Sequence, residues 1–125
     1  MLRSLLIIVS LLAAAALYKG SGPGGAAFGH TEYTFGPTPR DSVLTHSFPF
    51  VNEGDEPLVI FGTATSCHCV TVRKPSSPVA PGGTGEIVVT FDGSKSMRGR
   101  FQQFVRVTTS ATGESVKLYI YGELL

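Results

Sequence analysis

One short stretch in the middle of the sequence carries residue types from which a chemical site could be built. It holds Cys67 and Cys69, the two cysteines of the chain, on either side of His68. An oxidising compartment would favour a disulfide between them. In an extended strand, however, their Cα atoms would lie about 6.5 to 7 Å apart, at or beyond the upper limit for such a bond. A disulfide therefore requires a local bend, and we expect it to be easily reduced and to stabilise the fold little.

The same side chains suggest other chemistry if the cysteines are reduced. Two thiolates beside an imidazole suit copper(I), which accepts soft ligands at low coordination number. Zinc needs about four ligands, and only His46 and His30 remain to complete a set with the pair and His68. Alternation places His46 on the apolar side of its segment, either as an additional ligand or as a partly buried histidine bonded to backbone. An inert buried pair and a redox-active pair are the remaining alternatives.

The rest of the chain does not suggest a catalytic site. No serine has a histidine and a carboxylate at a motif spacing, and the glycine-rich run at residues 82–85 precedes a predicted strand rather than a helix, unlike a phosphate-binding loop. The net charge of +1 and the lack of a Lys/Arg stripe argue against nucleic-acid binding. We therefore expect a protein that is not an enzyme.

The N-terminus has the features of a targeting segment. Residues 5–17 are apolar except for one serine, and they follow a short positive region. As a helix this run spans about 20 Å, less than the ~30 Å hydrocarbon core of a bilayer, which favours a cleaved signal peptide. Because Leu2 and Tyr18 extend the run towards the lower limit for a transmembrane helix, a retained membrane anchor is the alternative. Either segment predicts export.

Beyond this segment the sequence reads as a tether followed by one β-domain. We expect residues 1–19 to be the signal peptide or anchor, residues 20–29 a flexible glycine-rich tether, and residues 30–125 the domain. Valine, threonine and aromatic residues alternate with polar ones between glycine and proline breaks, which is typical of short strands. Seven strands are predicted: 30–35, 43–51, 58–65, 70–74, 86–92, 100–109 and 116–122. This pattern favours a seven-stranded immunoglobulin-like β-sandwich, with a small Greek-key barrel as the alternative.

The last two predicted strands also suggest a contact surface. Alternation turns Tyr119 and Tyr121 away from the core residues Leu118 and Ile120, and Phe104 lies opposite its inward neighbour. If these strands pair, the three rings form one aromatic patch, and exposed aromatic patches often mark binding sites. The alternative is that a loop or the tether covers this face.

These residues together resemble a known family. The chain is similar to domain-of-unknown-function family 1573, bacterial exported modules related in fold to the domains of the ASPM/SPD-2/Hydin group. The matching segments are Phe35-Gly36, residues 46–54, residues 57–60, Ser66-Cys67-His68-Cys69, residues 79–87, residues 89–92, Gly99 and residues 118–122. One departure is His68, which stands where the family usually has glycine and so puts a tight turn in doubt.

The resemblance implies a non-catalytic sandwich with no established activity. We therefore expect an exported binding or scaffolding module of the periplasm or cell envelope, either free or anchored in the inner membrane. Its partner would be a protein or another envelope component, and the membrane itself if the N-terminal segment is retained. The alternative function is a small thiol protein that binds copper or exchanges disulfides through Cys67, His68 and Cys69.

Overall fold

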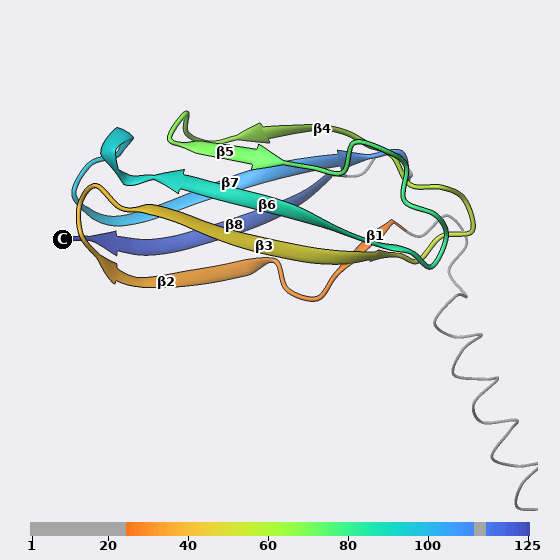
Figure 1. Cartoon of the computed structure of the whole chain (residues 1–125), viewed down its shortest axis with the longest axis horizontal. Helices are drawn as coiled ribbons and strands as arrows, with labels where there is room; N and C mark the ends of the chain where they lie inside the picture. Colours follow the sequence, from red (N-terminus) through yellow and green to blue (C-terminus); the bar gives the residue numbers. More distant parts are fainter. Residues whose placement is uncertain (1–24, 112–114) are drawn as a thin grey trace, which may run out of the picture.

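The computed structural model describes residues 25–111 and 115–125, which form two facing β-sheets (Figure 1). Its elements in chain order are β1 (Ala26–Phe28), β2 (Glu32–Thr38), β3 (Val43–Asn52), β4 (Ile60–Thr65), β5 (Val70–Arg73), β6 (Thr84–Asp92), the 3₁₀ helix η1 (Gly93–Lys95), β7 (Gly99–Thr109) and β8 (Ser115–Leu124). One sheet has the strand order β1-β3-β6-β5, and the other has the order β2-β8-β7-β4. The predicted all-β sandwich is confirmed.

Alternating apolar side chains build the core between the sheets. In β6, Ile87, Val89 and Phe91 are buried, whereas the residues between them are more exposed, as expected for a strand with one face inward. The largest fully buried side chains are Phe48, Phe50, Phe91, Ile87, Leu118, Ile120 and Leu124. The predicted core positions of Leu118 and Ile120 are therefore confirmed.

The order of strands could not be read from the sequence. β7 and β8 form an antiparallel hairpin, but the far neighbour of β8 is β2, which pairs with it in parallel. The β2–β8 register shifts between Thr34 and Pro37, where a proline removes one N–H from the ladder. β4 and β5 belong to different sheets, so residues 66–69 carry the chain across one end of the sandwich.

The structure differs from the prediction at the start of the domain. It has eight strands within the described residues rather than seven, because β1 pairs with the end of β3. β1 lies in the range expected to be a tether. Pro49 of β3 has no N–H to donate to a neighbouring strand. β1 pairs only with residues 50–52 of β3, so the proline lies just beyond that ladder.

Asn52 fastens the loops at the end of the sandwich opposite the β4–β5 crossing. Its side chain is 1% exposed and donates to the carbonyl oxygens of Glu56 (2.7 Å) and Val79 (2.9 Å). Its Oδ1 accepts a hydrogen bond from the N–H of Gly54 at 2.9 Å. A buried amide with all these partners satisfies backbone groups that the loops would otherwise leave unpaired.

The expected N-terminal hydrophobic helix and most of the expected tether lie outside the described residues. Within residues 25–111 and 115–125, no helix is long and apolar enough to cross a membrane.

Candidate functional site

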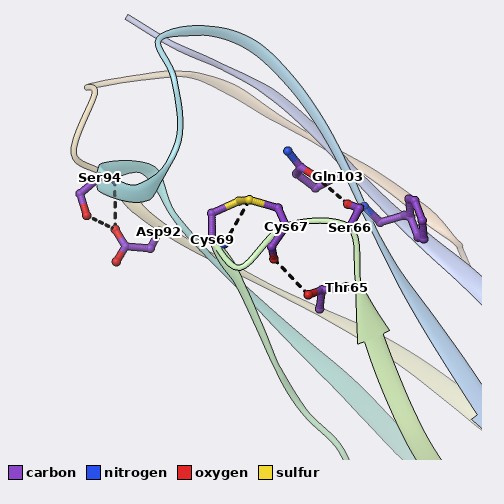
Figure 2. Close-up of a disulfide and its surroundings, with 8 residues drawn as sticks. Thr65, Ser66, Cys67, Cys69, Asp92, Ser94 and Gln103 are labelled. Carbon is purple, nitrogen blue, oxygen red and sulfur yellow. Dashed lines mark hydrogen bonds between the residues drawn. A yellow bond between two sulfur atoms is a disulfide. The ribbon is translucent and has the colours of Figure 1, made fainter.

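The two cysteines lie in the crossing between β4 and β5, and they form a disulfide (Figure 2). Their Cα atoms are 5.1 Å apart, closer than the spacing of alternate residues on a strand. The reason is a turn in which the N–H of Val70 donates to the carbonyl oxygen of Cys67 at 3.1 Å. The bend that a disulfide requires is thus supplied by the reversal of the chain between the sheets. This turn forms although His68, which is exposed, stands between the two cysteines.

Hydrogen bonds fix this crossing to both sheets. On one side, the hydroxyl of Ser66 donates to Oε1 of Gln103 (2.6 Å) and accepts from the N–H of Phe104 (2.9 Å), both in β7. On the other side, the N–H of Asp92 in β6 donates to the carbonyl oxygen of Cys69 at 2.8 Å. Figure 2 shows Ser66 and Asp92 on opposite sides of the disulfide. The crossing therefore ties the two sheets together at this end.

The two cysteines differ in their exposure to solvent. Cys69 is 1% exposed, whereas Cys67 is half-buried against the edge of the core. A thiol from another molecule would reach Cys67 first. Because both sulfurs are bonded to each other, neither is available as a thiolate ligand, and the copper hypothesis for Cys67, His68 and Cys69 applies only to the reduced pair. It stays a prediction.

The structure does not bring His46 to the cysteines. Within the described parts of the chain, no group of three or more His, Cys, Asp or Glu side chains is placed to share one metal ion. Instead, Nε2 of His46 lies 2.8 Å from Nε2 of His30, and its ring stacks on Tyr33 at a centroid distance of 3.7 Å. Burial, and then the neighbouring charge of His30, lower the pKa of His46. Sequence reasoning missed this pair because the two histidines are 16 residues apart and meet only through the pairing of β1 with β3.

The three predicted aromatic rings lie together on the outward side of the β2-β8-β7-β4 sheet. Phe104 of β7 is the cross-strand partner of Tyr119 of β8, and their ring centroids are 5.9 Å apart. The ring centroids of Tyr119 and Tyr121 are 6.2 Å apart. All three are half-buried. The ammonium group of Lys117 lies 4.9 Å from the centroid of Phe104, a cation–π contact that covers one end of the row. We call these rings and the groove described next the aromatic face.

A groove of about 520 Å³ continues the row beyond Tyr121. Part of its apolar lining comes from Phe35 and Pro37 of β2, at the point where the β2–β8 register shifts, and Phe101 of β7 also lines it. Arg100 of β7 and Glu123 of β8, which are cross-strand partners, supply charges of opposite sign. The groove thus combines apolar area with polar groups that can orient a bound chain.

A hydrogen bond fixes the ring between the row and the groove. The hydroxyl of Tyr121 donates to Oε1 of Glu32 at 3.1 Å. Partial burial, the hydrogen bond and the negative charge of Glu32 raise the pKa of Tyr121, since all three favour the neutral phenol. Tyr121 is therefore a neutral, oriented ring at physiological pH.

Comparison with known sequences identifies the family. The sequence profile of a family of proteins of unknown function, DUF1573, matches residues 26–124, which is the whole sandwich. The chain belongs to the DUF1573 family. No curated protein matches this DUF1573 chain in sequence.

Solved structures share the fold of this DUF1573 chain. A protein of unknown function from Porphyromonas gingivalis W83 aligns with a TM-score of 0.68 and 13% identity, covering 83% of this chain, which spans about half (49%) of that protein. The ASH/PapD-like domain 7 of human CEP192 aligns with a TM-score of 0.67 and 13% identity, over 84% of this chain and 89% of that domain. The YadV chaperone aligns with a TM-score of 0.60 and 12% identity, over 81% of this chain and 52% of that one. At these identities the likeness establishes an immunoglobulin-like, PapD-like fold alone.

Proposed function

We propose that this DUF1573 protein is a non-catalytic, exported binding or scaffolding module of the bacterial envelope, and that it holds its partner on the aromatic face. The observation that carries the proposal is the contiguity of Phe104, Tyr119 and Tyr121 beside a groove on the outward side of one sheet. Export is inferred from the apolar N-terminal run of the sequence. The absence of catalysis is inferred from the lack of a catalytic motif spacing.

The chemistry of this face supports contact with a protein, or with another envelope component that is not a polyanion. Large aromatic side chains offer contact area at low entropic cost, and those here are already oriented by their neighbours. The charges around them are mixed: Glu32 and Glu123 are negative, whereas Arg100 and Lys117 are positive. A face without excess charge does not select a polyanion such as nucleic acid, so apolar contact and shape supply the affinity.

Site-specific photocrosslinking tests the proposal. A photoreactive phenylalanine analogue is placed at position 119 and, as a matched control, at position 71, an exposed threonine on the outward side of β5 in the other sheet. In cells of the source bacterium, we expect one discrete adduct from position 119 and none from position 71. Excess wild-type protein should suppress the adduct. A Tyr119→Ala competitor should need a concentration at least about fivefold higher for the same suppression, as for a buried interface aromatic.

Two outcomes would count against this function. Equal adducts from positions 119 and 71 would show that the face is not selective. Equal competition by the wild type and by Tyr119→Ala would show that the ring does not contact the partner.

The disulfide supports a second candidate function, thiol–disulfide exchange. In such a reaction a partner thiolate attacks Sγ of Cys67, the more exposed of the two cysteines, and Sγ of Cys69 leaves as a thiolate that takes up a proton. A second thiol of the partner then resolves the mixed disulfide. The Cys67–Cys69 disulfide becomes a dithiol with two added electrons and protons, and the partner dithiol becomes a disulfide.

Equilibration in glutathione buffers of defined ratio distinguishes this candidate. An exchanging pair should become alkylatable on both cysteines at ratios found in oxidising compartments, and a trapped mixed disulfide should form at Cys67 in a Cys69→Ala variant. A pair that stays oxidised throughout is structural. Because the exchange reaction uses the two sulfur atoms and the proposed docking uses the aromatic rings, loss of exchange should leave the position-119 adduct unchanged.

A further inference from the structure

Two imidazole rings face each other at the edge of the sandwich where β1 gives way to β2. Nε2 of His30 and Nε2 of His46 are 2.8 Å apart, and the ring centroids are separated by 5.1 Å. His30 is exposed, whereas His46 is half-buried. The contact joins atoms that could each carry a lone pair, so the pair differs from a histidine bonded to backbone.

The fold holds both rings in place. His46 lies in the β3–β6 ladder opposite Val89, and its ring is stacked on Tyr33 of β2 with an interplanar angle of 12°. His30 follows β1, whose Phe28 pairs with Phe50 of β3, and its ring lies 5.2 Å from that of Phe48. A ligand that binds both nitrogens therefore meets a pair whose backbone positions are already set, which reduces the entropic cost of binding.

The chemistry of the contact is that of a pair sharing one proton. In a hydrogen bond between two imidazole nitrogens, one Nε2 donates its proton and the other accepts it with its lone pair. Replacing that proton with a metal ion would present two nitrogen ligands. With Zn–N bonds of about 2.0 to 2.1 Å and tetrahedral geometry, the two nitrogens lie roughly 3.3 Å apart. The required opening is about half an ångström, and the exposed ring of His30 can supply it.

We infer that His30 and His46 form a bidentate site for a late first-row divalent metal ion, Cu²⁺ before Zn²⁺, with water in the remaining positions. Imidazole nitrogen suits both ions, and divalent copper binds nitrogen sites more tightly than zinc does. The site is separate from Cys67, His68 and Cys69, and it uses neutral ligands that remain available when those cysteines are oxidised. A bound ion would clamp the segment after β1 to β3, and so fasten the N-terminal side of the domain to the sandwich.

The test uses the full chain with its disulfide intact, confirmed by the absence of alkylatable thiols. Equilibrium dialysis against Cu²⁺, and separately Zn²⁺, should give one bound ion per chain. Either His30→Gln or His46→Gln should weaken binding about tenfold or more, because the second ligand then no longer binds intramolecularly. His68→Gln removes the third histidine of the chain and is the matched control, with unchanged binding expected.

Spectroscopy separates this site from adventitious binding. The electron paramagnetic resonance spectrum of the Cu²⁺ protein should show two equivalent nitrogen ligands, and that of His30→Gln should show one. His30 is exposed, so this variant should keep the wild-type fold even if His46→Gln does not. Binding that survives His30→Gln, that is lost in His68→Gln, or that occurs only after reduction of the disulfide would overturn the assignment. So would the absence of binding.

Discussion

Gly122 is the position where adding one methyl group should most clearly disturb the packing. It lies in β8 opposite Phe101 of β7, and a Cβ at this position would be 2.5 Å from Cζ of that ring. The ring has little room to retreat, because it stacks on Phe91 of the opposite sheet at a centroid distance of 4.1 Å, and Phe91 is fully buried. Gly122→Ala must therefore shift an aromatic pair that joins the two sheets.

Two opposing effects set the expected magnitude. Overpacking a well-packed core costs about 1 to 3 kcal/mol of folding free energy. Replacing glycine with alanine in a strand restrains the unfolded chain and returns roughly 0.5 to 1 kcal/mol. We therefore expect Gly122→Ala to lower the free energy of unfolding by about 1 to 2 kcal/mol, and Tm by about 4 to 8 °C for each kcal/mol in a domain of this size.

Urea denaturation followed by circular dichroism measures the change, with the slope m unchanged if only stability is affected. Gly62→Ala in β4 is the matched control, because a Cβ there meets no atom within 4 Å, and it should be neutral or slightly stabilising. Phe101→Leu should couple to Gly122→Ala, so that the double variant loses less than the sum of the two. Wild-type stability of Gly122→Ala, or an equal loss in Gly62→Ala, would refute this account of the packing.

Three further predictions concern the loops, the disulfide and the aromatic face. Asn52→Ala removes a buried amide with three backbone partners and should lower the free energy of unfolding by about 2 to 4 kcal/mol in urea denaturation. Replacing Cys67 with serine and Cys69 with alanine opens a very small ring and should cost only about 1 to 2 kcal/mol, so a loss as large as that of Asn52→Ala would contradict it. Ultraviolet or NMR titration should place the pKa of Tyr121 above its ordinary value of 10.0, and Glu32→Gln should lower it. Since the folded state favours the neutral phenol, this contribution to stability is present below pH 10 and is lost as the pH rises above it.

Local patterns were sufficient to predict every described strand except β1. Ile87, Val89 and Phe91 could be assigned to the core because a strand places every second side chain on the same side, whatever its neighbours are. The same rule placed Tyr119 and Tyr121 together on the outward side, and the β7–β8 pairing confirmed that Phe104 joins them.

Contacts between distant segments were not predictable in the same way. The pairing of β2 with β8, the meeting of His30 with His46, and the groove beside Tyr121 each depend on which strands become neighbours. Strand order is selected by the packing of the whole chain, and many orders are compatible with one alternation pattern.

The cysteine pair shows where the two levels of information meet. Residue order alone determined that Cys67 and Cys69 lie between two strands with one residue between them, and hence that any bond would need a bend. Only the tertiary structure decided that β4 and β5 belong to different sheets, so that the chain must turn sharply there and the two Cα atoms approach to 5.1 Å. The physical reason is that alternation is a property of neighbouring residues, whereas the path between sheets minimises the free energy of the whole core.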